Sequence, residues 1–80
     1  MNNDFCVRVD YRGNFMAPIS FRLNNTNTKY IRKIIRIWHE VDAQSHEIIR
    51  YSCLLTDGTT VILSFINGQW QIQQTIQITS

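Results

Sequence analysis

Residues 47–78 read EIIRYSCLLTDGTTVILSFINGQWQIQQTIQI, which is three apolar, alternating segments separated by Asp57-Gly58 and by Asn67-Gly68. Both dipeptides are typical of tight turns between antiparallel strands, because Asp, Asn and Gly tolerate a left-handed backbone. The segment therefore predicts a three-stranded meander, and the rest of the chain is expected to add strands to it.

The register of this meander follows from the loop length that keeps the large apolar side chains on one face. A three-residue loop, Thr56-Asp57-Gly58 with Gly58 left-handed, achieves this, whereas a two-residue loop at Asp57-Gly58 divides the apolar set between two faces. At Asn67-Gly68 a two-residue type I′ loop is required. Gln74 then falls on the apolar face, where it predicts a bulge or the rim of the core. The predicted pairs are Leu55–Thr59, Cys53–Val61, Tyr51–Leu63, Ile49–Phe65, Phe65–Trp70 and Leu63–Ile72.

Alternation predicts two further strands near the start of the chain. Residues 5–11 alternate apolar and polar side chains, and Arg12-Gly13-Asn14 is a turn signal. Pro18 has no amide hydrogen and belongs at a strand start, an edge or a bulge. Residues 19–23 alternate again, and the polar run at 24–27 predicts a loop.

Residues 28–41 are compatible with two structures. A helix would align an apolar stripe and could be capped by Asn27 or Thr28. The four isoleucines, the tyrosine and the tryptophan prefer a pleated backbone, and all neighbouring segments read as strands. We predict a long, bent strand and keep the helix as the alternative. The helical stripe would consist of Tyr30, Ile31, Ile34, Ile35 and Trp38.

The fold prediction is one all-β domain over residues 1–80, with about six antiparallel strands in a bent sheet or small open barrel that ends in the meander. The predicted core residues are Phe5, Val7, Val9, Ile19, Phe21, Leu23, Ile34, Trp38, Ile49, Tyr51, Cys53, Val61, Leu63, Phe65, Trp70 and Ile72.

Composition places the chain in an ordinary globular class, with 44% hydrophobic residues and a net charge of +2 over 80 residues. This charge permits nucleic-acid binding but lacks the basic bias of a duplex-DNA binder. The first residues carry no secretory signal pattern, and no apolar run is long enough to span a bilayer. We therefore expect a cytoplasmic protein, not bound to a membrane, in which Cys6 and Cys53 stay reduced.

No residue pattern indicates catalysis. Neither cysteine has a catalytic motif around it, and three isolated glycines exclude a phosphate-binding Gly-rich loop. His39 and His46 lie near Glu40, Asp42 and Glu47, but a spacing of seven through a polar loop favours solvated side chains over a metal site. We expect no catalytic residue, no metal and no cofactor.

Two surfaces are candidates for binding. Basic and aromatic residues interleave in Lys29–Trp38, and the candidate ligand or nucleic-acid surface is Tyr30, Arg32, Lys33, Arg36 and Trp38. The favoured alternative places Tyr30 and Trp38 in the core. The last strand has an outer row of uncharged glutamines that guards poorly against edge pairing, so it is a candidate docking edge for a protein partner or a second copy. That edge comprises Gln71, Gln73 and Gln77.

Several segments together resemble short bacterial domains of unknown function that carry the run P-x-x-F-x…Y-x-V-x-x-V…W…D-G…G-x-W. The resemblance covers roughly residues 18–72 and consists of apolar and turn positions. It implies a small all-β fold with no assigned catalytic residues, and it supplies no functional site. The matching segments are Pro18-Ile19-Ser20-Phe21-Arg22, Tyr30-Ile31-Arg32-Lys33-Ile34-Ile35, Trp38, Thr56-Asp57-Gly58 and Gly68-Gln69-Trp70.

The functional expectation is a non-enzymatic binding or interaction module of the bacterial cytoplasm. The alternative is a small β-barrel that binds single-stranded nucleic acid through the basic and aromatic face of residues 29–38. Burial of Trp38 would favour the first, and exposure of Trp38 beside Arg32 and Arg36 would favour the second.

Overall fold

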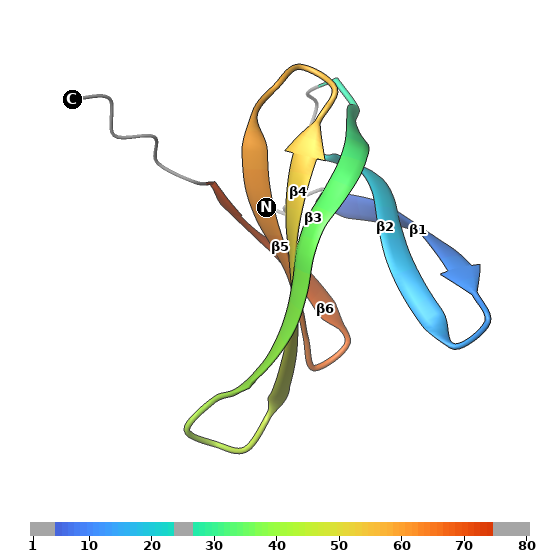
Figure 1. Ribbon diagram of the computed structural model, residues 1–80. Coiled ribbons are helices and arrows are strands. Elements are labelled where there is room, and N and C mark those ends of the chain that lie inside the picture. The colour runs from blue at the N-terminus through green and yellow to red at the C-terminus, as the bar shows by residue number, and fades with distance from the viewer. Residues whose placement is uncertain (1–4, 24–26, 75–80) are drawn as a thin grey trace.

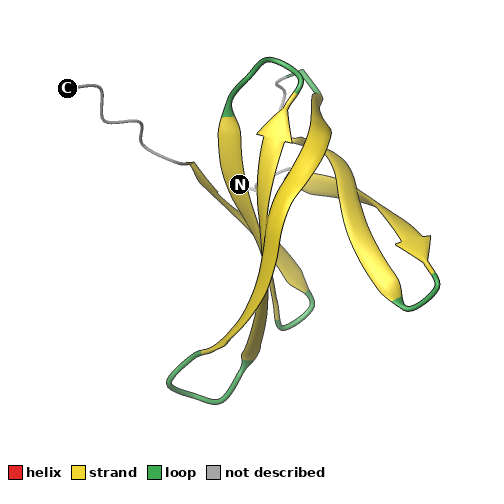
Figure 2. Ribbon diagram, viewed as in Figure 1, coloured by secondary structure: helices red, strands yellow, loops and turns green. Residues whose placement is uncertain are grey.

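The computed structural model describes residues 5–23 and 27–74, which form one antiparallel sheet (Figures 1 and 2). The strands pair strictly in chain order, from β1 at one edge to β6 at the other. Among the described residues there is no helix that could cross a membrane. The six strands are β1 (Cys6–Arg12), β2 (Phe15–Arg22), β3 (Lys29–Val41), β4 (Glu47–Leu55), β5 (Thr60–Ile66) and β6 (Gln69–Gln74).

The all-β prediction is confirmed, and so is the register of the meander. At the β4–β5 turn the amide of Leu55 donates to the carbonyl of Thr59 over 2.8 Å, and Gly58 has a φ of 92°. At the β5–β6 turn Asn67 and Gly68 both have positive φ, as a type I′ turn requires. The observed pairs include Cys53–Val61, Tyr51–Leu63, Ile49–Phe65, Phe65–Trp70 and Leu63–Ile72.

The pairing of β5 with β6 continues without a shift to Val61–Gln74, where β6 ends. The bulge that was one of two alternatives for Gln74 is therefore not observed. Gln74 is the last described residue of β6, and its predicted place at the rim of the core stays a prediction.

Residues 29–41 are a strand, so the helix alternative is wrong. Two register shifts make Arg32 and Ile35 extra residues opposite β4, that is, β-bulges. The more buried positions of β3 are Ile31, Ile34 and Trp38, at spacings of three and four. The first bulge puts Ile31 and Ile34 on the same face at a spacing of three, and the second puts Trp38 on the opposite face. The spacings of three and four therefore imitate the period of a helix although the three residues do not share a face.

A third bulge lies in β2, and because of it the predicted core position of Ile19 is wrong. Arg8 pairs with Ser20 and Val9 pairs with Pro18, so Ile19 is the extra residue. Ile19 was predicted in the core, but it is 39% exposed, whereas Ala17 and Pro18 are buried. Simple alternation failed here because a bulge next to proline interrupted it.

The core lies on one face of the sheet, which we call the inner face. It consists of Phe21, Tyr51, Cys53, Leu55, Val61 and Leu63, with Phe5, Val7, Ile31, Ile34, Ile49, Trp70 and Ile72 packed against it. Trp38 is not among these residues, so its predicted core position is wrong. The opposite face is the outer face.

The inner face is buried because the sheet curls into a half-barrel. In Figure 1 the β1–β2 hairpin stands to one side of β4, β5 and β6, and β3 connects the two groups. Across the curl, the hydroxyl of Tyr51 on β4 donates to the carbonyl of Met16 on β2 over 2.7 Å. The ring of Tyr51 also lies 5.6 Å from that of Trp70 on β6. One buried side chain thus contacts β2, next to one edge of the sheet, and β6, at the other edge.

We expect Tyr51→Phe to lower the free energy of unfolding by about 1–2 kcal/mol, because the Met16 carbonyl loses its buried donor while the ring still packs. Urea unfolding followed by tryptophan fluorescence measures the change. Tyr11→Phe removes the same atom from a side chain that is 69% exposed, and should change stability by less than about 0.5 kcal/mol. If the two variants lose equal free energy of unfolding, the hydrogen bond of the Tyr51 hydroxyl does not stabilise the curled sheet.

Candidate binding surface

Trp38 lies on the outer face, opposite Arg50 of β4, and is half-buried. The bulge at Ile35 separates it from Ile34, so these two positions of equal parity face opposite sides of the sheet. The Arg36 guanidinium carbon lies 5.0 Å from the centre of the Trp38 ring, and the indole N–H donates to Glu40 over 2.7 Å. Trp38 is thus not a core residue, and its ring is already in contact with Arg36 and Glu40.

Glu40 joins Trp38 to an ion pair. Its carboxylate also lies 3.0 Å from Nε of Arg50, and Arg50 donates through Nη1 to the hydroxyl of buried Ser64 over 2.8 Å. The hydrogen bond from Trp38, and then the contact with Arg50, lower the pKa of Glu40. Glu40 and Arg50 are therefore committed to one another and to Trp38, and this part of the outer face has its charges balanced.

The candidate residues of β3 largely share the outer face. Tyr30, Lys33, Arg36 and Trp38 lie on it, and Arg32 is the extra residue of the first bulge. Lys33, which strict alternation placed with the isoleucines, is moved to the outer face by that bulge. Tyr30 is 58% exposed, so the expectation of a core role for it is wrong.

Three of the eight basic residues are paired with described carboxylates. These pairs are Arg12 with Asp10, Lys29 with Asp57 and Arg50 with Glu40. The other five make no ion pair with any carboxylate in the described part of the chain. We call these five, which all belong to β1, β2 or β3, the unpaired cations: Arg8, Arg22, Arg32, Lys33 and Arg36.

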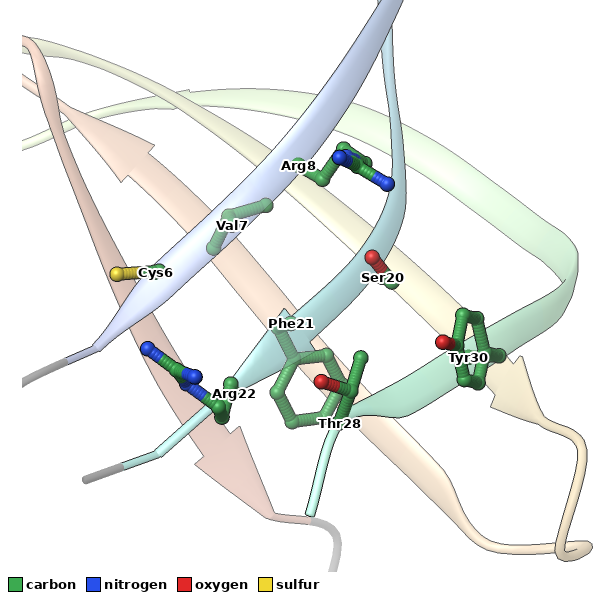
Figure 3. Close-up of a pocket in the computed structure, with 8 residues that line it drawn as sticks. All are labelled: Cys6, Val7, Arg8, Ser20, Phe21, Arg22, Thr28 and Tyr30. Carbon is green, nitrogen blue, oxygen red and sulfur yellow. The ribbon is translucent and has the colours of Figure 1, made fainter. Parts of the chain in front are cut away.

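A pocket of about 460 Å³ lies where β1 and β3 begin and β2 ends (Figure 3). Its lining includes two of the unpaired cations, Arg8 and Arg22, together with Tyr30. Of the lining residues, only Tyr30 had been predicted from the sequence to bind a ligand. The other residues come together through pairing between strands, which no local motif reveals. The lining residues are Cys6, Val7, Arg8, Ser20, Phe21, Arg22, Thr28 and Tyr30.

The two histidines each lie beside one carboxylate. His39 is 3.4 Å from Glu47, and His46 is 3.2 Å from Asp42, whose other oxygen accepts the amides of Gln44 and His46. These backbone and side-chain hydrogen bonds, with that from the His46 amide the largest contribution, lower the pKa of Asp42. Within residues 5–23 and 27–74, no three His, Cys, Asp or Glu side chains gather as metal ligands would.

The two cysteines occupy different environments. Cys53 is buried in the core, and burial raises the pKa of its thiol to about 11, whereas Cys6 is exposed at the pocket.

The predicted docking edge lies on β6, which is an edge strand. Gln71 and Gln73 are exposed on its outer face. Gln77, the third residue of the predicted docking edge, lies outside the described residues.

Comparisons of the chain with protein-family models, with curated proteins and with solved structures find no match. The resemblance to short bacterial domains stays a prediction. The described residues define the protein's class by architecture, an all-β half-barrel of six antiparallel strands in meander order.

Asp57 predicts a pH dependence of stability. Its carboxylate accepts hydrogen bonds from the hydroxyl and amide of Thr59 and from Lys29, and these lower its pKa from 3.8 to about 2. A lowered pKa stabilises the folded state above the unfolded value, and this contribution is lost as the pH falls towards 2. We expect Asp57→Asn to be less stable than the wild type at pH 7, and the difference to shrink by pH 2.

Urea midpoints measured at a series of pH values test this expectation. Glu47→Gln is the matched control, because it removes one carboxylate from an exposed ion pair outside the turn, where pairs contribute little. It should follow the wild type across the series. A difference between the wild type and Asp57→Asn that stays constant from pH 7 to pH 2 would contradict the assignment.

Proposed function

We propose that the protein is a non-enzymatic binding module whose partner is a single-stranded nucleic acid. The observation that supports this proposal is the grouping of the five unpaired cations on β1, β2 and β3 with the exposed ring of Tyr30 among them. Tyr30 pairs with Ser20 on the side of Arg8 and Arg22, and it precedes Arg32 and Lys33 on its own strand.

Cations without carboxylate partners are available to phosphates. A strand that contacts them releases condensed counterions, so binding should weaken steeply with salt. An exposed aromatic ring adds stacking with any unpaired base, and this favours a single strand over a duplex whose bases are already stacked. The modest net charge of +2 agrees with a short contact, not with a long groove along a duplex.

The stacking residue in this proposal is Tyr30, not Trp38. The guanidinium of Arg36 already lies over the Trp38 ring, and Glu40 beside it would repel a phosphate. Trp38 instead holds Arg36 in place at one end of the proposed surface. This assignment changes the role that the sequence suggested for the tryptophan and keeps the basic residues beside it.

Binding of a fluorescein-labelled single-stranded 12-mer, followed by anisotropy, tests the proposal. If all five cations contact phosphates, the logarithm of the affinity should fall with the logarithm of salt concentration at a slope of about −3.5. Arg32→Ala and Lys33→Ala should each make this slope shallower by about 0.7, because each removes one phosphate contact.

Arg12→Ala is the matched control. It also removes one positive charge, but from a side chain that is paired with Asp10, and it should leave the slope unchanged. If Arg12→Ala weakens binding as much as Lys33→Ala does, binding responds only to net charge, and the proposed surface is wrong. Absence of binding at low salt would overturn the proposal altogether.

A second candidate function is supported by the position of β6. This strand is an edge of the sheet, and its sequence, QWQIQQ, carries no charge or proline that would oppose pairing with another strand. We propose that a second copy of the chain pairs there, edge to edge. Self-association of this kind would place two cationic surfaces in one assembly.

Sedimentation analysis of the wild type and of a Gln71→Lys, Gln73→Lys double variant tests this candidate. The wild type should form dimers, and the variant should remain monomeric because lysines on an edge strand oppose pairing. Gln69→Lys is compared with the double variant. Its lysine lies at the end of β6 next to the turn, and the turn residues Asn67 and Gly68 are unchanged. A wild type that stays monomeric at high concentration would rule out pairing through β6.

A further inference from the structure

We infer that the pocket between β1, β2 and β3 binds one nucleotide, with its phosphate on the arginine side of the pocket, where Arg8 and Arg22 lie, and its base against Tyr30. The inference rests on the proposed function, because the bound strand supplies the nucleotide. It adds a defined subsite to a surface that otherwise consists of separate charges. Ser20, Arg22 and Thr28, which no sequence motif singles out, become ligand-contacting residues.

The floor of the pocket is set by the size of three register partners. Arg8, Ser20 and Tyr30 are paired across β1, β2 and β3, so their side chains project from the same face, with neighbouring Cβ atoms about 5 Å apart. Ser20 is the smallest of the three and stands in the middle (Figure 3). It is only 6% exposed although it lies on the outer face, because the two long side chains flank it.

The cationic part of the pocket has two guanidinium groups. Arg22 pairs with Cys6 one step along the same face from the Arg8–Ser20 pair, and Figure 3 shows its side chain beside Cys6. Neither Arg8 nor Arg22 has a described carboxylate partner. Guanidinium groups bind phosphate oxygens through paired N–H donors, and the hydroxyls of Ser20 and Thr28 are further donors in the same lining.

The aromatic part of the pocket lies on the other side of the floor. Tyr30 is separated from Arg8 by two strand spacings, about 10 Å, which leaves room for a sugar between a phosphate and a stacked base. The volume of about 460 Å³ also lies in the range of small-ligand pockets. An isolated phosphate would leave the Tyr30 side unused, whereas a nucleoside without phosphate would leave both arginines unused.

Titration of ¹⁵N-labelled protein with uridine 5′-monophosphate tests the inference, with uridine and inorganic phosphate as separate arms. The nucleotide should shift the amide resonances of the pocket residues and bind more tightly than either part alone. Arg22→Gln should weaken nucleotide binding by about tenfold or more, because it removes a charged donor. Arg12→Gln removes a charge from the same hairpin outside the pocket and should leave binding unchanged.

Alkylation of Cys6 is a second measurement that needs no variant. Cys6 is exposed and lines the pocket, whereas Cys53 is buried, so the reaction with iodoacetamide reports on this site. The nucleotide should slow the alkylation, and uridine should not. Unprotected Cys6 together with unshifted pocket resonances would overturn the inference, and so would equal affinity for inorganic phosphate and for the nucleotide.

Failure of the pocket and failure of the proposed function give different results. If the 12-mer binds with the expected salt slope and Arg32→Ala and Lys33→Ala make that slope shallower, while uridine 5′-monophosphate neither shifts the pocket resonances nor protects Cys6, the cationic surface stands and the nucleotide pocket is wrong. If neither the 12-mer nor the nucleotide binds, both proposals fall. Circular dichroism of each variant confirms that the exposed substitutions leave the sheet intact.

Discussion

The hydrogen bond from the Tyr51 hydroxyl to the Met16 carbonyl joins two strands that approach each other because the sheet must bury its one apolar face. The described residues form one sheet, and a sheet with one apolar face must bury that face against something. Within residues 5–23 and 27–74 the apolar surface available for this is another part of the same sheet, so the strands curl until β2 approaches β4. Tyr51 can be buried at this point because its ring packs against Trp70 while its hydroxyl finds an acceptor.

Curling of this degree requires bulges, and the bulges decide which residues reach the surface. Each extra residue increases the local twist and reverses the alternation beyond it. In β3 the two bulges keep Ile31 and Ile34 on the inner face and place Lys33, Arg36 and Trp38 on the outer face. The same deviation from regular pairing that encloses the core therefore also gathers the basic residues of β3 on one side.

The parts of the fold that could be predicted are those that depend on neighbouring residues alone. Asp57-Gly58 and Asn67-Gly68 specify their turns through backbone conformation, and one continuous apolar face then leaves a single register for β4, β5 and β6. The bulges at Ile19, Arg32 and Ile35 depend on the partner strand, so parity misplaced Ile19 and Trp38. The pocket could not be predicted from the sequence for the same reason, since Arg8, Ser20 and Tyr30 are neighbours only across strands.

The net charge of +2 understates how basic the outer face is, because the described acids are committed elsewhere. Asp42 accepts the His46 amide of its own turn, and Asp57 accepts the hydroxyl and then the amide of Thr59, which lowers the pKa of both carboxyl groups and keeps them charged at those places. Glu40 is held by Trp38 and Arg50, and Glu47 lies beside His39. The carboxylates thus form turns and two contacts between β3 and β4, while β1, β2 and β3 keep cations that have no described carboxylate partner. A surface of this kind arises from the distribution of charges among structural roles, and a total charge cannot reveal it.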